Sequence, residues 1–214
     1  AWGQHGRQAR LERQQKQDLA QCDAGGAPDA ALAIAACERV LQMQPDHVEG
    51  LMNRGNALLC RGRAEEALAD YDRALLLKPE DPDLLVNRGN GLVDLERFEA
   101  ALASFDHALR LRPESVAGLS NRAEALRNLN RNLEALASCQ RALELDPENI
   151  DALLNQGTSL YLLARPKEAI ATFDRALTLK PDFAPAHANK IFVLDYLPDL
   201  GFVEHQEARN QFFR

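Results

Sequence analysis

The stretch VEGLMNRGNALLCRGRAEEALADYDRALLLKPED, residues 48–81, decides the fold, because the chain repeats its pattern at a fixed interval. The next 34 residues, 82–115, read PDLLVNRGNGLVDLERFEAALASFDHALRLRPES. Proline marks the same position in each unit, at Pro45, Pro79, Pro113, Pro147 and Pro181. A fixed period of this size indicates stacked structural units, none of which buries its apolar face alone. The function of the protein therefore depends on the surface that the stack presents.

Each unit predicts two helices joined by a short turn. In residues 48–61, Leu51, Gly55 and Leu58 recur at i, i+4 and i+7, which is one face of a helix. Residues 64–77 carry a second stripe of the same spacing, and the proline that follows ends this helix because it lacks an amide hydrogen. No segment alternates between polar and apolar residues as a strand does. We therefore predict an all-α fold.

Small residues and helix caps recur with the period. Counting positions from Val48, position 8 is glycine in three units and Ala123 in a fourth. Glycine inside a helix costs about 1 kcal/mol relative to alanine, so its recurrence predicts close contact between the paired helices. Asp81, Ser115 and Asn149 stand just before a first helix, where their side chains are suited to N-capping. These features predict a tightly packed helix pair in every unit.

Small residues at positions 8 and 20, an aromatic residue at 24, alanine at 27 and proline at 32 resemble the tetratricopeptide repeat. The resemblance implies a superhelical solenoid of helix-turn-helix units. We expect four repeats, at residues 48–81, 82–115, 116–149 and 150–183. Residues 1–47 are expected to form a long helix and a degenerate edge repeat. Residues 184–214 are expected to form a half-repeat and a terminal helix that leads to a further domain.

Composition excludes several classes of function. The net charge is −7, which argues against a general nucleic-acid or anionic-membrane binder. No run of residues reaches the ~18–20 apolar residues that a membrane span needs. The four cysteines show no metal-binding spacing, and Cys37 and Cys139 take position 24, which is aromatic in other units. We therefore expect reduced thiols rather than a disulfide framework, and a reducing compartment, the cytoplasm.

A polar stripe on the first helices is the strongest indication of a binding surface. At about 100° per residue, positions 2, 6, 9 and 13 cluster opposite the packing face. In tetratricopeptide arrays the first helices line the concave groove, so the resemblance implies that this stripe faces a guest. The candidate peptide-binding residues are Asn53, Asn56, Asn87, Asn90, Asn121, Asn128, Asn155 and Asn189.

Two interpretations of the asparagines at position 6 stay open. In one, the carboxamides form a ladder that donates to and accepts from the backbone of an extended peptide. In the other, they form hydrogen bonds between neighbouring repeats without any ligand. The sequence does not separate these interpretations.

The charges near the stripe restrict the partner. Position 2 holds Glu49, Asp83, Ala117 and Asp151, with no cluster of lysines. A carboxylate-clamp groove, which captures acidic chaperone tails, needs cations there, and we reject that partner class. A neutral or basic extended segment suits the stripe better.

Two sets of arginines also follow the period. The arginines at the turns are expected to interact favourably with the negative, C-terminal end of the dipole of the first helix rather than to bind anions. They are Arg63, Arg97, Arg131 and Arg165. Those at position 7 are expected to bridge to acidic neighbours: Arg54, Arg88 and Arg122.

The end of the chain departs from the repeat. Residues 187–198 (HANKIFVLDYLP), followed by Glu204-His205-Gln206 and Ala208-Arg209, resemble the junction that precedes the catalytic half of bacterial O-linked N-acetylglucosamine transferase-like proteins, the SPINDLY group. In that family the superhelix recruits protein substrates and the catalytic half uses a UDP-sugar. The catalytic half of such a protein would lie beyond Arg214, so the resemblance assigns no catalytic residue to this chain.

No catalytic, cofactor or metal site is expected in this chain. His187 and His205 are isolated histidines, and the glycines recur at helix-packing intervals rather than in a phosphate loop. We expect a non-catalytic module that binds protein or extended peptide. The alternative is the substrate-recruiting part of a glycosyltransferase. A weaker one is a scaffold in which two copies pair through Phe202, Val203, Phe212 and Phe213.

Overall fold

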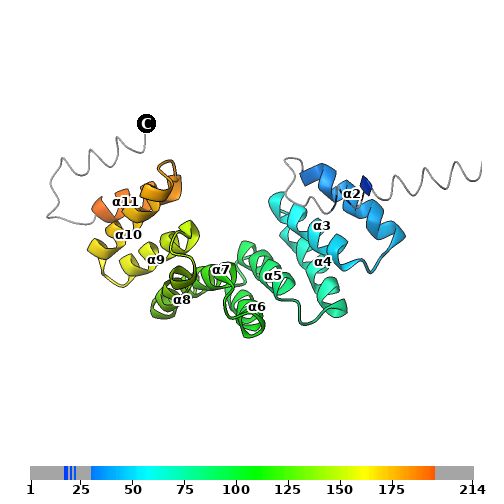
Figure 1. Cartoon of the computed structure of the whole chain (residues 1–214), viewed down its shortest axis with the longest axis horizontal. Helices are drawn as coiled ribbons and strands as arrows, with labels where there is room; N and C mark the ends of the chain where they lie inside the picture. Colours follow the sequence, from blue (N-terminus) through cyan, green and yellow to red (C-terminus); the bar gives the residue numbers. More distant parts are fainter. Residues whose placement is uncertain (1–16, 19, 21, 23–29, 196–214) are drawn as a thin grey trace, which may run out of the picture. The chain divides into compact units, whose positions relative to one another are not determined.

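The computed structural model describes residues 17, 18, 20, 22 and 30–195, and every regular element within them is an α-helix. The all-α fold of consecutive helix pairs is confirmed. The helices follow one another along the chain as α2 (Ala30–Met43), α3 (Val48–Cys60), α4 (Ala64–Leu77), α5 (Pro82–Asp94), α6 (Phe98–Leu111), α7 (Val116–Asn128), α8 (Asn132–Leu145), α9 (Ile150–Leu162), α10 (Pro166–Leu179) and α11 (Ala184–Asp195) (Figure 1).

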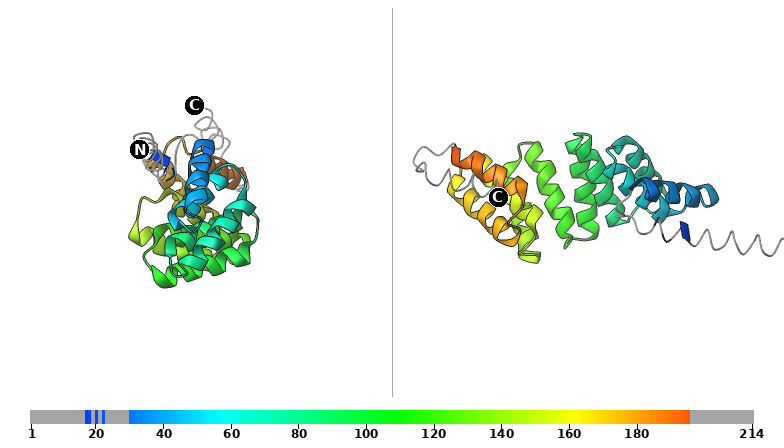
Figure 2. Two further views of the ribbon diagram at one scale, coloured as in Figure 1. Left: turned by 90° about the vertical axis from the view of Figure 1, so that its right-hand side faces the viewer. Right: turned by 90° about the horizontal axis from the view of Figure 1, so that it is seen from above.

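The chain divides into two compact units, residues 1–111 and 112–214. In the first, the successive helices from α2 to α6 pack on one another in chain order, and α3 also contacts α5. In the second, α7 to α11 do the same, and the alternate helices α7, α9 and α11 contact one another in order (Figures 1 and 2). The first helices of the repeats therefore line one side of each unit.

The interior combines small residues and leucines with one large ring in three of the four hairpins of residues 48–183. Tyr71, Phe105 and Phe173 at position 24 are fully buried, as are the alanines at positions 20 and 27. A Cβ added to Gly89 would lie 2.3 Å from Phe105 Cε1, and one added to Gly157 would lie 2.4 Å from Phe173 Cε1. The glycines are therefore present because the rings pack directly on the backbone of the first helix.

The helix starts follow the capping prediction. Asp81 Oδ1 accepts from the amides of Asp83 and Leu84 at 3.0 and 3.1 Å. Ser115 Oγ accepts from Gly118 N at 3.1 Å, and Asn149 Oδ1 accepts from Ala152 N at 2.9 Å. These three predicted caps are confirmed. His47 caps α3 in the same way, through Nδ1 and Gly50 N at 2.9 Å, and this cap was not predicted from the sequence.

The turns within the hairpins share one geometry. The amide of Arg63 donates to the carbonyl of Leu58 at 3.0 Å, which is the long bond of a Schellman motif, and the same bond recurs in the other three hairpins. The residue before the arginine adopts positive φ: Gly62, Glu96, Asn130 and Ala164. The arginine side chain then forms a fork with the glutamate three residues on, at 2.7–2.8 Å, in the pairs Arg63–Glu66, Arg131–Glu134 and Arg165–Glu168.

The arginines at position 7 bond to side chains of neighbouring helices, two of them as predicted. Arg54 forms a fork with Asp70, with Nε–Oδ2 at 2.7 Å, and this carboxylate is buried. Arg88 pairs with Asp72 at 2.6 Å and also donates to Ser104. Arg122 donates to Ser138 Oγ at 2.6 Å. The prediction of an acidic neighbour is confirmed for Arg54 and Arg88.

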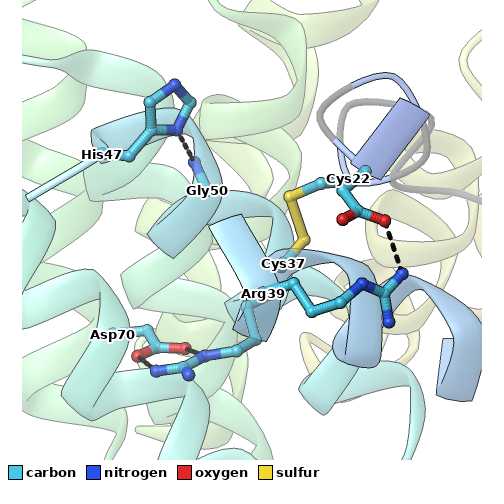
Figure 3. Close-up of a disulfide and its surroundings, with 8 residues drawn as sticks. Cys22, Cys37, Arg39, His47, Gly50 and Asp70 are labelled. Carbon is cyan, nitrogen blue, oxygen red and sulfur yellow. Dashed lines mark hydrogen bonds and ion pairs between the residues drawn. A yellow bond between two sulfur atoms is a disulfide. The ribbon is translucent and has the colours of Figure 1, made fainter. Parts of the chain in front are cut away.

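The expectation of reduced cysteines is wrong for one pair. Cys22 and Cys37 form a disulfide, with an S–S distance of 2.09 Å, next to the ion pair between Arg39 and the buried Asp18 (Figure 3). Cys60 and Cys139 are free thiols, the first exposed and the second buried. The disulfide is typical of proteins from oxidising compartments rather than the cytoplasm.

The repeat itself explains this disulfide. Cys22 and Cys37 hold positions 9 and 24 of their unit. In the next unit these positions hold Asn56 and Tyr71, and Tyr71 donates its hydroxyl hydrogen to Asn56 Oδ1 at 2.7 Å. The two positions therefore meet inside a hairpin, and two cysteines placed there come within bonding distance. The signal was a cysteine at both positions of one unit, whereas the prediction considered position 24 alone.

Candidate functional site

The first helices of the second unit enclose a groove of ≈ 520 Å³. Three asparagines from position 6 of successive repeats line it, Asn121 on α7, Asn155 on α9 and Asn189 on α11. They face the same groove because the 34-residue period returns each residue to the same face of equivalent helices. Three of the eight predicted peptide-binding residues therefore lie together in this groove.

Two of these carboxamides also connect neighbouring repeats. Asn155 Nδ2 donates to the backbone carbonyl of Ser120 on α7 at 3.1 Å, and Asn189 Nδ2 donates to Thr158 Oγ1 on α9 at 3.2 Å. A carboxamide offers two N–H donors and an oxygen with two lone pairs, so one such bond leaves most of its capacity. The two interpretations of the position-6 asparagines are therefore compatible, because the same side chain joins repeats and lines the groove.

Charged side chains give the groove its polarity. Glu124 on α7 and Asp151 on α9 supply two carboxylates, and Arg127 on α7 supplies one cation. Among the described residues, Arg127 Nε is buried and has no hydrogen-bond acceptor. Leu154 and Thr158 complete the lining. The groove thus combines amide donors and acceptors with a small excess of negative charge.

An apolar hollow of ≈ 200 Å³ adjoins the groove and shares Arg127, Thr158 and Asn189 with it. Its other lining residues are Tyr161, Leu162, Phe173, Phe192 and Val193. The rings of Tyr161 and Phe192 meet edge to face, with centroids 5.5 Å apart. Leu162 and Phe192 are about half exposed, at 47% and 50%. A polar groove therefore continues into an aromatic hollow.

The other predicted peptide-binding residues do not line this groove. In the first unit, Asn53 is buried, Asn56 accepts from Tyr71, and Asn87 and Asn90 are half-buried on α5. Asn128 is exposed on α7 and donates to the carbonyl of Glu124 in its own helix at 3.0 Å.

Arg127 was not predicted from the sequence to be part of the site, and Leu154 was not among the candidate peptide-binding residues. They hold positions 12 and 5, which lie on one flank of the polar stripe, about 100–120° from the asparagines at position 6. Glu124, Asp151 and Thr158 belong to positions 9 and 2, which the stripe included. Widening the stripe by one neighbouring row would therefore have found the remaining lining residues.

The described residues offer no metal centre, since they contain no group of three or more His, Cys, Asp or Glu side chains able to hold an ion. His187 is buried, and its Nε2 lies 2.7 Å from the carbonyl of Pro181, where it stabilises the start of α11. His205 lies outside the described residues. The helices of the described part are too short and too polar for any of them to cross a membrane.

The tetratricopeptide-repeat family matches residues 22–83, 86–150 and 134–184. These segments cover more than half of the chain, and the protein therefore belongs to the tetratricopeptide-repeat family. Proteins of this class generally mediate protein–protein interaction. A comparison with curated protein sequences gave no match.

Solved structures with a similar fold include YrrB, described as a tetratricopeptide-repeat protein with an unusual peptide-binding site. It is 26% identical, with a TM-score of 0.61, over 75% of this chain and 84% of that one. A thermophilic tetratricopeptide-repeat protein of Thermus thermophilus is 21% identical over 77% and 90% of the two chains, with a TM-score of 0.67. MamA of Desulfovibrio magneticus is 22% identical over 78% and 92%, with a TM-score of 0.64. The last two likenesses concern the fold alone.

Proposed function

We propose that this protein is a non-catalytic binding module that holds an extended peptide segment in the groove lined by α7, α9 and α11. The observation that carries the proposal is the row of Asn121, Asn155 and Asn189 in one groove. Carboxamides at a regular spacing suit a peptide backbone, which offers a donor and an acceptor at every residue. The similarity to YrrB, a repeat protein with a peptide-binding site of its own, supports the same use of this fold.

The partner is a neutral or basic segment of protein. Glu124 and Asp151 outnumber Arg127 in the groove, and the chain as a whole carries a net charge of −7. An acidic segment would meet repulsion from both carboxylates, whereas a basic one gains favourable charge contacts. Nucleic acid and anionic membrane are disfavoured as partners for the same reason.

The test is capture of partners by the full chain, followed by groove variants. Replacing Asn121, Asn155 and Asn189 with alanine is expected to weaken binding of a captured peptide at least tenfold. Asn128→Ala is the matched control, because that side chain lies on α7 outside the groove and bonds only its own helix. Circular dichroism establishes that the variants stay folded. Equal binding by the triple variant and the control would contradict the proposal.

A stability effect is expected beside the binding effect. Loss of the bonds from Asn155 and Asn189 costs about 0.5–1.5 kcal/mol each, partly offset by the better helix propensity of alanine. Binding is therefore compared at a temperature where all variants are fully folded. A loss of stability alone, with unchanged affinity, would assign these asparagines to packing between repeats.

A second candidate function is recruitment of protein substrates for a glycosyltransferase of the O-linked N-acetylglucosamine transferase-like group. The sequence of residues 187–209 favours it most, beside the NRGNAL and NRGNGL wording of residues 53–58 and 87–92, and residues 196–209 lie outside the described part. Under this proposal the peptide groove would present substrates to a catalytic domain. Reading the gene beyond the codon for Arg214 tests it, and a continuation without a nucleotide-sugar domain would exclude it.

A scaffold role through pairing of two copies is the weaker candidate. The predicted apolar face, Phe202, Val203, Phe212 and Phe213, lies outside the described residues. Light scattering over a wide concentration range measures the mass in solution, and a strict monomer would remove this candidate.

The compartment forms part of the proposal. The sequence suggested the cytoplasm, whereas the Cys22–Cys37 disulfide favours an oxidising compartment. Thiol labelling of the protein directly in its native host tests this, because a fully reduced pair in the host would restore the cytoplasmic expectation.

A further inference from the structure

The aromatic hollow beside the groove has the size of a single ring. Its volume is ≈ 200 Å³, and a cavity of about 150 Å³ lined by apolar side chains accepts benzene. Its lining includes the fully buried Phe173 and the edge-to-face pair of Tyr161 and Phe192. A large apolar guest would cover Leu162 and Phe192, which now expose about half of their surface to water.

The rim favours an aromatic guest over an aliphatic one. Arg127 lines both the hollow and the groove, and its buried Nε has no acceptor among the described residues. A planar guanidinium stacks on the face of an aromatic ring and is attracted by its quadrupole. Tyr161 and Phe192 offer the guest ring edges and faces for the same kind of contact. An aliphatic side chain would gain only the burial of its apolar surface, without the stacking and ring contacts.

The groove can bind a positive charge of the ligand close to the aromatic ring that the hollow holds. Glu124 and Asp151 line the groove, and the groove and hollow meet at Arg127, Thr158 and Asn189. In an extended peptide, residues i and i+2 point the same way and lie about 7 Å apart. Because the groove and the hollow share three lining residues, one extended ligand can place a ring in the hollow and a cation near Glu124 and Asp151 from the same face of its backbone.

We infer that the hollow is an anchor subsite for an aromatic side chain of the bound peptide, and that the groove beside it takes a lysine or arginine two residues away. This inference rests on the proposed function and specifies its ligand, an extended segment with an aromatic residue and a basic residue separated by one position. The aromatic residue supplies most of the discrimination, because the basic side chain stays partly solvated.

The probes are blocked heptapeptides in a glycine–serine background that contain Lys-Ser-Phe or the reverse, Phe-Ser-Lys. Each is compared with versions in which alanine replaces the phenylalanine or glutamate replaces the lysine. Fluorescence anisotropy with the full chain measures affinity. One of the two orders is expected to bind at least tenfold more tightly than its alanine version, and more tightly than its glutamate version at low salt.

Protein variants locate the two subsites. Leu162→Asp places a charge at the mouth of the hollow and is expected to remove the preference for phenylalanine over alanine. Leu133→Asp is the matched control, because Leu133 is 70% exposed on α8 and lines neither hollow nor groove. Glu124→Gln with Asp151→Asn is expected to remove the preference for lysine over glutamate and to keep the preference for phenylalanine.

The outcomes distinguish the anchor from the proposed function. Peptides that bind through Asn155 with equal affinity for phenylalanine and alanine would overturn the anchor and leave the proposed function standing. Failure of every peptide to bind would overturn both. The chain contains its own Phe212-Phe213-Arg214, so the double variant Phe212→Ser, Phe213→Ser is also measured. A tenfold gain in peptide affinity in that variant would make the protein's own segment the occupant and overturn the inference of a foreign one.

Discussion

At the scale of single residues, the glycine at position 8 and the ring at position 24 depend on each other. Gly55, Gly89 and Gly157 lie under Tyr71, Phe105 and Phe173, and an added Cβ would lie 2.3–2.6 Å from the nearest ring carbon. The third of the four matching repeats has Ala123 at position 8 and Cys139 at position 24, where a smaller side chain leaves room for a methyl group. The two positions therefore vary together for a steric reason.

Gly89→Ala is expected to destabilise the protein by about 1–2 kcal/mol. Overpacking against Phe105 costs about 1–3 kcal/mol, whereas the helix propensity of alanine returns up to about 1 kcal/mol. In a Phe105→Cys background, which copies the third repeat, the same change is expected to stabilise. Urea unfolding of the four variants of this cycle measures the effect, and the same sign in both backgrounds would contradict the steric account.

The free thiols are expected to differ in reactivity. Burial raises the pKa of the Cys139 thiol from 9.0 to about 12, and Cys60 is exposed. Since only the thiolate reacts, iodoacetamide at pH 8 should label Cys60 alone in the folded protein and both residues after unfolding. Mass spectrometry counts the labels. Two further labels are expected after reduction of the unfolded chain, and their appearance without reductant would exclude the disulfide.

The raised pKa of Cys139 also predicts a pH dependence. The folded state holds the proton above pH 9, where the unfolded thiol releases it, so the thiol's contribution to stability is full below pH 9 and declines as the pH rises towards 12. Cys139→Ala removes this contribution, and its stability should fall less over that range.

At the scale of elements, local rules predicted the helices and most of their caps. Asp81, Ser115 and Asn149 cap as expected because capping depends on a side chain and the amides two or three residues on. The groove, by contrast, depends on which helices become neighbours in space. The 34-residue period was enough to predict that Asn121, Asn155 and Asn189 lie in one row. Arg127 was missed because a residue on the flank of a stripe joins the site only through the side chains around it.

Turn residues with positive φ are a second feature of the elements. Gly62 adopts this conformation at no steric cost, whereas Ala164 and Glu96 adopt it with φ values of 57° and 56°. A residue with a Cβ pays about 1–2 kcal/mol for this region. The Schellman turn thus stores a small strain in two of the four hairpins.

Ala164→Gly is expected to stabilise the protein by about 1 kcal/mol or less, because the strain relieved exceeds the added entropy of the unfolded chain. Asn130→Gly is the matched control at the equivalent turn, and its gain should be smaller because asparagine tolerates positive φ. Thermal unfolding measures both. A loss of stability in Ala164→Gly would show that the unfolded-state entropy dominates at this turn.

At the scale of the whole molecule, the division at residue 111 was not predicted, because the 34-residue step continues through it without a change of phase. The disulfide lies in the first compact unit and the groove lies in the second. In a repeat protein each unit is stabilised mainly by its immediate neighbours. Changes at one site should therefore have local effects.

Replacing Cys22 and Cys37 with serine is expected to destabilise the start of the chain by about 3 kcal/mol, the usual value for a loop of about 15 residues. Hydrogen exchange should rise in α2 and α3 and stay unchanged in α9 to α11. Peptide affinity at the groove should also stay unchanged. Weaker peptide binding in the serine variant would contradict this local picture and indicate that the two units are coupled.

The glycine and the ring that covers it belong to the same hairpin, as with Gly89 on α5 and Phe105 on α6. Each hairpin thus contains both halves of this particular steric fit, whereas Gly91 on α5 packs against Leu68 of the preceding hairpin. Duplication or deletion of a hairpin by recombination would preserve that fit. The gene can therefore gain or lose a hairpin, and so change the extent of its binding surface, without compensating mutations at positions 8 and 24.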